Sequence, residues 1–515
     1  MTEKLTTVFY QRHVEAGAKI TEFSGWHKPL QYPTGIMKEH LATRKNAGLF
    51  DVSHMGRFII SGEDSLPFLQ HALTNNAASL DVGLAQYTMI PTETGGVIDD
   101  AYLYRFFEDE FLLVVNAGNR EKDWAHLEHI RQQFPGAKMV DRTHEMAMLS
   151  LQWPYAKDIL DPLIEGDLPE PKRNQQIIVR IEDEPVWVAR TGYTGEPICF
   201  ELFFGHEAAL QIWDLLKGNG AIPVGLGARD SLRLEAGLPL YGHELGIDPE
   251  GKEIPAFASS LSKFAVSFSP LKGDFIGKEA LHKQFLALKR ITDLKFDNIE
   301  ALPRRIMLLE LGARGIARPG DKVVRDGETV GYVTSGTMVP YWDTEGEGVE
   351  SRFSDETERR AIAMALVDSD LWENDLVEVE IRGRSTPAMV VPYFLRGEAP
   401  PFARSIIHHR EAETATSKAP ATFPQKAAEL LESAIANTKW RQDECINLIP
   451  SEMTMSPMTR ALSIMDPVGR YAEHKAVKAL EDAEVFYYQG TEFIWEVEER
   501  LKAELKDYLG CNSVE

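Results

Sequence analysis

The sequence predicts an α+β protein of several domains, and three observations support this fold class. Helical and strand-like patterns alternate irregularly over residues 1–300, without a βαβ rhythm or a G-x-G-x-x-G turn after a strand. Residues 304–391 are almost entirely strand-like. A run rich in Ala, Thr and Pro then interrupts the chain at 411–424. We therefore do not expect a doubly wound nucleotide-binding fold.

The first 300 residues contain clear local signals. Residues 39–47 have the pattern of a helix that ends at Gly48, and the following LFDVSHMGRFIISG has the apolar and β-branched content of a strand. In QYTMIPTETGGVIDDAYLYR, Gly95 and Gly96 predict a turn that leads into another strand. We assign residues 1–300 to a core of two intertwined α+β subdomains.

The strand-rich region predicts a separate small β-barrel or sandwich at 301–400. Asp326-Gly327 and Arg382-Gly383 each have the composition of a hairpin turn between two strands. The acidic stretch YWDTEGEGVESRFSDETERR is nearly free of aliphatic residues. It is more typical of a solvated hairpin insertion than of a strand.

Composition excludes several classes of protein. A formal net charge of -24 and a pI near 5.1 oppose binding to nucleic acid or to anionic membranes, which need a basic field. Cys199, Cys445 and Cys511 are too far apart to indicate a disulfide framework or a metal site. The sequence has no apolar run of membrane-spanning length and no signal or transit peptide pattern at its start. We expect a cytoplasmic protein without a metal.

The adjacent pair Asp99-Asp100 is the strongest candidate for chemistry. Side chains alternate along a strand, so Asp100 shares a face with Tyr102 and Tyr104, while Asp99 points the other way. A carboxylate beside phenol rings suits a flat heteroaromatic ligand with ring N–H donors. The alternative is that both acids lie at an exposed strand end.

Six segments, read together, resemble the glycine-cleavage T-protein family over residues 6–396. These segments are FSGWHKPLQY, GLFDVSHMG, QYTMIPTETGGVIDD, LVVNAGNREKD, RTGYTGE and GLGARDSLRLEAGLPLYG, and VGYVTSG resembles the family's C-terminal barrel. The resemblance implies three domains around a central folate channel. It also implies transfer of a one-carbon unit from the aminomethyl-lipoyl arm of a partner, the H-protein, to tetrahydrofolate, with release of ammonia.

The resemblance also implies roles for individual residues. The family's catalytic aspartate falls on Asp100, the acid that strand alternation also selects. Glu201 matches an acid that binds the pterin, and Arg229 matches another folate-site residue. By the same match, Tyr87, Asn116 and Tyr193 are expected in the wall of the folate site. Strand alternation adds Tyr104, which shares the Asp100 face.

Structural roles would also account for several of these residues. Arg229 is followed by Asp230, and the two could form an ion pair. Asn116 could close a strand, and Tyr193 lies in a glycine-rich turn that backbone geometry would explain. We expect His54 to be a hydrogen-bonded structural histidine.

The sequence departs from the family at three places, and these leave the one-carbon donor open. EPICFE, one residue longer, replaces the usual segment that ends at the position of Glu201, and Trp153 replaces a usual glycine. GIDPEGKEIPAFASSLSKFAVSF matches the family poorly after LYG. Related folate enzymes that demethylate glycine derivatives or methylated sulfur compounds are the alternative. A further alternative is a non-enzymatic folate-binding relative, which carries the signature K-G-C-Y-x-G-Q-E. The corresponding turn here, RTGYTGE, has no cysteine, and this counts against a binding module.

After a linker at 401–424, residues 425–515 resemble the N-terminal arm of serine hydroxymethyltransferase, a mostly helical piece of a pyridoxal-phosphate enzyme fold. ECINLIPSEMTMSP, GRYAEH and FYYQGTEFIWEVEERLKAEL carry this resemblance. It places Ser451, Tyr471, Glu473 and Tyr488 near pyridoxal phosphate. The family's cofactor-binding lysine, histidine and aspartate lie further on, so we expect pyridoxal phosphate and hydroxymethyltransferase activity only if a continuation or a separately encoded remainder is supplied.

Overall fold

The computed structural model describes residues 5–152, 154–166, 168, 173–312, 315–346, 351–396, 403–408, 474–477, 483–486 and 492–509. The chain divides into two compact units, Met1–Thr416 and Ser417–Glu515. Trp153, most of the expected linker, and Ser451, Tyr471, Glu473 and Tyr488 lie outside the described residues.

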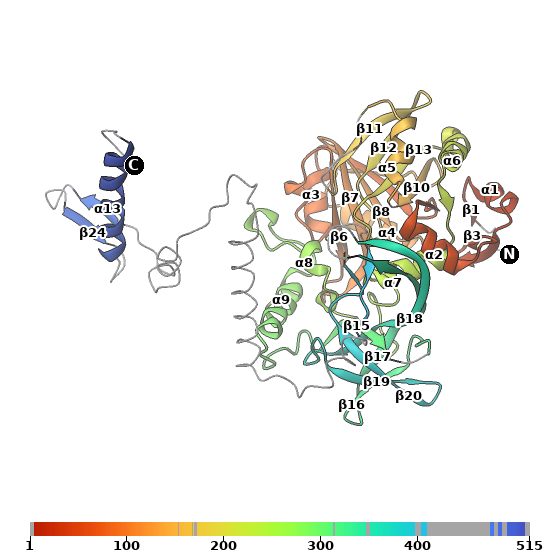
Figure 1. The fold of residues 1–515 in the computed structure, drawn as a ribbon. Coiled ribbons are helices and arrows are strands. Elements are labelled where there is room, and N and C mark those ends of the chain that lie inside the picture. The colour runs from red at the N-terminus through yellow and green to blue at the C-terminus, as the bar shows by residue number, and fades with distance from the viewer. Residues whose placement is uncertain are drawn as a thin grey trace. The chain divides into compact units, whose positions relative to one another are not determined.

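Two sheets form the centre of the first unit (Figure 1). The five-stranded sheet has the order β6-β7-β8-β5-β9 and consists of β5 (Gly56–Ser61), β6 (Leu84–Pro91), β7 (Val97–Phe107), β8 (Glu110–Val115) and β9 (Lys138–Asp141). The six-stranded sheet has the order β11-β12-β13-β10-β4-β14 and consists of β4 (Gly48–Asp51), β10 (Met146–Gln152), β11 (Gln176–Ile181), β12 (Glu184–Ala189), β13 (Cys199–Gly205) and β14 (Ile222–Pro223).

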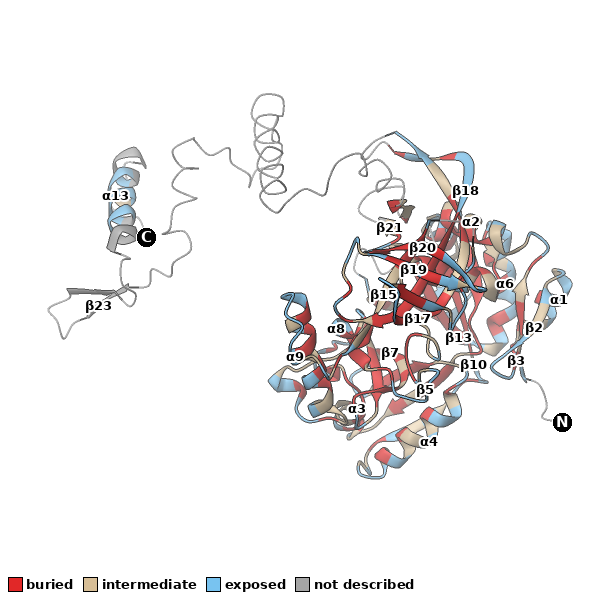
Figure 2. Ribbon diagram, turned by 90° about the horizontal axis from the view of Figure 1, so that it is seen from below, coloured by how far each residue is buried: buried red, intermediate tan, exposed pale blue. Residues whose placement is uncertain are grey.

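The two sheets face each other across a shared apolar layer. Tyr104 and Phe106 of β7 pack there with Phe203 of β13, and all three are buried. The outer face of the five-stranded sheet is covered by α3 (Ser65–Ala72) and α4 (Arg120–Arg131), and that of the six-stranded sheet by α5 (Ala156–Leu160) and α6 (Ala209–Gly218). Figure 2 shows this pattern as buried strands beneath helices with exposed outer surfaces. The first unit thus has four layers at this point.

The β6–β7 hairpin follows the predicted turn. Gly95 adopts φ +87°, a conformation that glycine reaches without a steric penalty, and Thr92 Oγ1 accepts a hydrogen bond from the Gly96 amide at 2.9 Å. Along β7, Ala101 and Leu103 pack against the helical layer, whereas Tyr102 and Tyr104 pack in the layer between the sheets. The predicted alternation of faces is confirmed.

The strands between Arg304 and Val391 close into a barrel with the order β15-β18-β17-β16-β19-β20. Its strands are β15 (Arg304–Leu311), β16 (Lys322–Arg325), β17 (Glu328–Glu345), β18 (Arg352–Asp368), β19 (Leu376–Ile381) and β20 (Arg384–Val391). Both expected hairpin turns are present, and the residues of each have positive φ: 54° and 86° at Asp326-Gly327, and 51° and 75° at Arg382-Gly383.

Helix α7 (Leu226–Glu235) contacts both α2 (Ile36–Lys45) and the barrel strands β17 and β18 (Figure 1). Its last residue, Glu235, lies at the centre of a buried charge network. Arg44 donates to Glu235 Oε2 at 2.9 and 3.0 Å and also pairs with Glu196. Arg360 of the barrel donates to Glu235 Oε1 at 3.1 Å. The network therefore joins four distant segments of the chain.

The remaining elements of the first unit surround these parts. A three-stranded sheet has the order β1-β3-β2. The remaining bounds are β1 (Leu5–Thr6), β2 (Lys19–Phe23), β3 (Trp26–Gln31), α1 (Tyr10–Glu15), α8 (Ser262–Ala265), α9 (Lys278–Thr292), β21 (Leu395–Arg396) and β22 (Arg404–Ser405).

Two local predictions were wrong. LFDVSHMGRFIISG forms two strands, β4 and β5, which belong to different sheets because the chain turns at Val52–Met55 with a hydrogen bond from the Met55 amide to the Val52 carbonyl. The acidic stretch is a hairpin, but β17 and β18 continue into it as paired strands. Trp342 holds it against α2, donating from its indole nitrogen to the Leu41 carbonyl at 3.1 Å.

In the second unit, the described residues form β23 (His474–Val477), β24 (Ala483–Phe486) and α13 (Glu492–Leu509), and the two strands pair antiparallel. Helix α13 confirms the helix expected before Gly510. Within the described parts of the chain, we find no helix with both the length and the apolar content needed to cross a membrane.

Candidate functional site

Asp100 lies on the β7 face that points into the layer between the sheets. Tyr87, on the paired strand β6, donates its phenolic O–H to Asp100 Oδ2 at 3.0 Å. Asn116, directly after β8, donates its amide N–H to Asp100 Oδ1 at 2.9 Å. Each carboxylate oxygen thus has a fixed donor, and the side chain is half-buried. The alternative of an exposed strand end is wrong.

The surroundings of Asp100 favour its neutral form more than water does. Burial, followed by the charge of the neighbouring Asp99, raises the pKa of Asp100 to about 7, against the lowering effect of the Tyr87 and Asn116 hydrogen bonds. A carboxyl with this pKa can gain or lose a proton near neutral pH. Such tuning is typical of groups that hold or exchange protons in active sites.

Asp99 points to the opposite side and is completely buried. It accepts hydrogen bonds from the Asn116 backbone at 2.8 Å, the Asn116 side chain at 2.9 Å and the Asn119 side chain at 2.6 Å. The Asn116 amide therefore bridges the two adjacent carboxylates. Asn116 does follow a strand, but its side chain also fixes both acids.

Glu201 reaches the same layer from the opposite sheet. Tyr104 donates to Glu201 Oε2 at 2.9 Å, and Thr191 donates to the same oxygen at 2.6 Å. The Tyr104 ring is fully buried against Phe203. Tyr104 therefore orients Glu201 through its hydroxyl, while its ring belongs to the core.

Arg229 and Tyr193 lie beside Glu201. The Arg229 guanidinium is centred 5.0 Å from the Tyr193 ring, and one of its terminal nitrogens is buried with no hydrogen-bond partner among the described residues. Burial lowers the pKa of Arg229, whereas the charge of Glu201 raises it. Asp230 pairs with Arg233 at 2.8 Å. The alternative of an ion pair between Arg229 and Asp230 is therefore wrong.

Tyr193 connects the two ends of this group. Burial raises the pKa of its phenol. The charges of Arg233 and Arg229 lower this pKa, whereas the charge of Asp100 raises it. Its hydroxyl donates to the Pro239 carbonyl. The contacts thus bring all seven residues expected at the site into one neighbourhood.

Some residues that contact this neighbourhood were missed in the sequence. Asn119, the N-cap residue of α4, and Asp123, in its first turn, are four residues apart, so they lie on the same face of the helix. This spacing was visible within LVVNAGNREKD. His54 is buried, but in the described part of the chain its Nδ1 has no hydrogen-bond partner, so the expected bond is not seen at that nitrogen.

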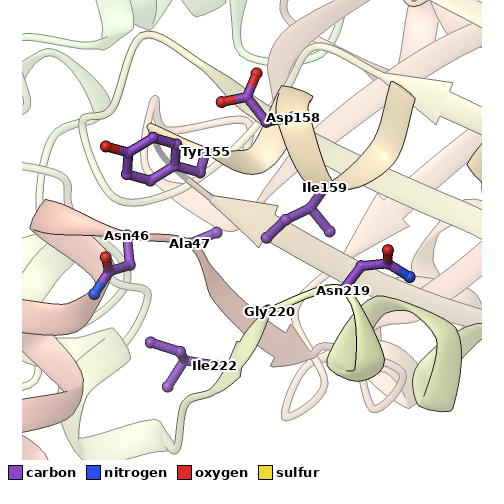
Figure 3. A pocket seen from close by; sticks show the side chains of 8 residues that line it. All are labelled: Asn46, Ala47, Tyr155, Asp158, Ile159, Asn219, Gly220 and Ile222. Carbon is purple, nitrogen blue, oxygen red and sulfur yellow. The ribbon is translucent and has the colours of Figure 1, made fainter. Parts of the chain in front are cut away.

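A separate hollow of about 500 Å³ opens where β4 begins (Figure 3). Its lining residues are Asn46, Ala47, Tyr155, Asp158, Ile159, Asn219, Gly220 and Ile222. Asp158 is the only carboxylate in this set, and none of the residues expected at the folate site lines the hollow. We therefore place the chemistry between the two sheets.

Comparison with known proteins identifies the chain. The family described as the GCVT N-terminal domain matches residues 9–254. The aminomethyltransferase of Deinococcus deserti is 39% identical over 382 residues, which cover 74% of this chain and 94% of the relative. That of Thermus thermophilus is 41% identical over 386 residues, covering 75% and 97%.

A solved structure, the glycine cleavage system aminomethyltransferase T from Bartonella henselae, is 30% identical with a TM-score of 0.62. The match covers 79% of this chain and 100% of that one. Fold and site thus define a protein of the GCVT class. Within that class, the chain belongs to the aminomethyltransferase family.

Proposed function

We propose that this aminomethyltransferase moves a one-carbon unit from the aminomethyl-lipoyl arm of an H-protein to tetrahydrofolate, and releases ammonia. Family membership supports the reaction class. The observation that carries the proposal is Asp100, held by Tyr87 and Asn116 in the layer between the sheets.

The residues around Asp100 fit a pterin. Asp100 and Glu201 offer carboxylate acceptors from opposite sheets, as ring N–H donors require. Tyr87 and Tyr102 present phenol rings on the Asp100 side, with ring centres 6.1 Å apart. Within the described residues, Arg229 keeps a buried N–H group without an acceptor, which a ligand oxygen or ring nitrogen would satisfy.

Asp100 would act mainly by position and charge. Tetrahydrofolate supplies the amine nitrogen that attacks the methylene carbon as ammonia leaves. Asp100, fixed at both oxygens, would orient that amine and stabilise the positive charge that develops on it. Glu201 would hold the other end of the pterin, with Tyr104 and Thr191 fixing its own orientation.

The test is a comparison of two adjacent substitutions. With aminomethyl-loaded H-protein and tetrahydrofolate, we expect Asp100→Asn to lower the rate of methylenetetrahydrofolate formation by about a hundredfold or more. Asp99→Asn should cost less, because that carboxylate faces away from the ligand. Equal losses in both variants, or no turnover of the parent despite folate binding, would refute the aminomethyl reaction.

Demethylation of a glycine derivative or a methylated sulfur compound is the second candidate. The longer EPICFE segment before Glu201 is the feature that keeps it open. Parallel assays with methylated glycines and sulfonium compounds separate the two reactions. Methyl transfer to tetrahydrofolate from one of these, without H-protein, would favour the demethylase.

For residues 425–515 we retain the proposal of a serine hydroxymethyltransferase-like arm. The helix α13, Glu492–Leu509, is consistent with the helical part of that arm. A separately encoded remainder would supply the residues that hold pyridoxal phosphate, and the assembled enzyme would act in the cytoplasm. Co-purification with a hydroxymethyltransferase fragment, and the absorbance of bound pyridoxal phosphate, would test this.

A further inference from the structure

A third carboxyl group adjoins the pair Asp99-Asp100. Asp123 lies in the first turn of α4 and is completely buried. Its side chain lies within hydrogen-bonding reach of Asp99. Neither of its oxygens is reached by a donor N–H or O–H of the described protein. A buried carboxylate without any donor would be very costly, so this group needs another explanation.

The donors around the two acids are distributed unequally. Asp99 receives three N–H donors, from the Asn116 backbone, the Asn116 side chain and the Asn119 side chain. Asp123 receives none from the residues that the structure describes. Two carboxyl groups in hydrogen-bonding contact cannot both be ionised without strong repulsion, and a shared proton removes that repulsion. The proton belongs on the acid that lacks donors.

We propose that Asp123 is a carboxylic acid that stays protonated in the folded protein at neutral pH, donates a hydrogen bond to ionised Asp99, and so acts as a positioning residue for Asp100. The link runs through Asn116, whose side-chain amide donates to Asp99 Oδ1 and to Asp100 Oδ1, each at 2.9 Å. The hydrogen bond from Asp123 would hold the Asp99 carboxylate in place. Asp99 in turn holds the Asn116 amide, and this amide holds Oδ1 of Asp100. The effect on turnover rests on the proposed function, but the protonation of Asp123 does not.

The charged groups that face Asp123 agree with this assignment. Asp99 and Asp100 face it from β7, and Lys122 from α4 itself. The Lys122 ammonium is directed elsewhere, donating to the Ile98 carbonyl at 2.7 Å and the Tyr241 hydroxyl at 2.9 Å. Burial, followed by the charge of Asp99, raises the pKa of Asp123 to about 10.

This protonation predicts how stability depends on pH. The folded protein keeps the proton up to about pH 10, whereas the unfolded chain releases it near the ordinary pKa of 3.8. The folded state therefore binds more protons throughout that interval, and this group makes stability fall as the pH rises. Asparagine at this position offers a neutral N–H donor of the same shape without a proton to lose.

The experiment compares Asp123→Asn, Asp123→Leu and a control, Glu121→Gln, in the full chain. Glu121 is an exposed acid in the same first turn, so the same kind of acid-to-amide substitution there leaves the buried cluster unchanged. Melting temperatures are measured from pH 6 to pH 10, and the infrared carbonyl band of a protonated carboxylic acid is measured at pH 8 by difference against Asp123→Asn.

We expect Asp123→Asn to melt at or above the parent at pH 7, with a gap that widens toward pH 10. The parent should show a protonated-carboxyl band that Asp123→Asn lacks. Asp123→Leu, which cannot donate, should lose about tenfold or more in turnover, whereas Asp123→Asn should keep it. Glu121→Gln should follow the parent at every pH.

The inference is overturned if Asp123→Asn unfolds or melts below the parent, or if the parent shows no protonated-carboxyl band. The melting and infrared results do not depend on turnover. If Asp100→Asn retained full activity, the proposed function would fail while the assignment of the Asp123 proton could still be confirmed.

Discussion

Tyr87→Phe should shift the pH at which the enzyme becomes active. The substitution removes only the hydroxyl that donates to Asp100 Oδ2 at 3.0 Å and leaves the ring in place. This hydrogen bond stabilises the ionised carboxylate and lowers its pKa, against burial and Asp99, which together bring that pKa to about 7. Without it, the carboxylate is less stable and the pKa of Asp100 rises.

The size of the shift follows from the energy of one charge-assisted hydrogen bond. Such a bond contributes about 1.5–3 kcal/mol. Since one pKa unit corresponds to about 1.4 kcal/mol, the pKa of Asp100 should rise by about 1–2 units. If the carboxylate is the active form, turnover rises with pH through this pKa. The midpoint should therefore move from about pH 7 in the parent to about pH 8–9 in Tyr87→Phe.

The assay is the rate of methylenetetrahydrofolate formation between pH 5.5 and pH 9.5 at saturating folate. Tyr102→Phe is the matched control, because Tyr102 lies on the same face but donates its hydroxyl to Asn174 at 2.6 Å. Its midpoint should equal that of the parent. An unchanged or lower midpoint in Tyr87→Phe would refute the assignment of Asp100 as the titrating group.

Three substitutions test the fold around the site. Arg360→Met leaves Glu235 short of one buried partner and should lower the free energy of unfolding in urea by about 3 kcal/mol. Gly277→Ala should lower it by about 1–3 kcal/mol, because φ is +75° and a Cβ would collide with the Thr92 carbonyl. Trp213→Ala empties a fully buried position and should cost about 3–5 kcal/mol, seen as a lower melting temperature. A loss below about 0.5 kcal/mol in any variant would contradict its stated cause.

Local patterns predicted those parts of the site that depend on one strand or one turn. Alternation along β7 separated Asp99 from Asp100, because consecutive side chains of a strand must point to opposite faces. The turns at Gly95-Gly96 and Asp326-Gly327 were visible because glycine reaches positive φ at little cost, as Gly95 and Gly327 do. These features need no knowledge of the rest of the chain.

Contacts between distant segments were not accessible in the same way. The hydrogen bond from Tyr104 to Glu201 joins residues 97 positions apart, and nothing in the sequence indicated that the two side chains meet. The division of LFDVSHMGRFIISG between two sheets was missed because its composition does not record which sheet each half joins. Asp123 was missed because its significance depends on the donors that it lacks, which sequence does not show.

The Glu235 network makes the barrel part of the active site's support. Arg44 binds Glu235 and also donates to the Thr194 carbonyl at 2.8 Å, next to Tyr193. Arg360 of the barrel holds the other Glu235 oxygen. A fragment cut at the end of the GCVT N-terminal match, residue 254, would keep every residue proposed to touch folate. It would nevertheless lose Arg360, and with it one of the cations that neutralise Glu235 beneath the Tyr193 turn.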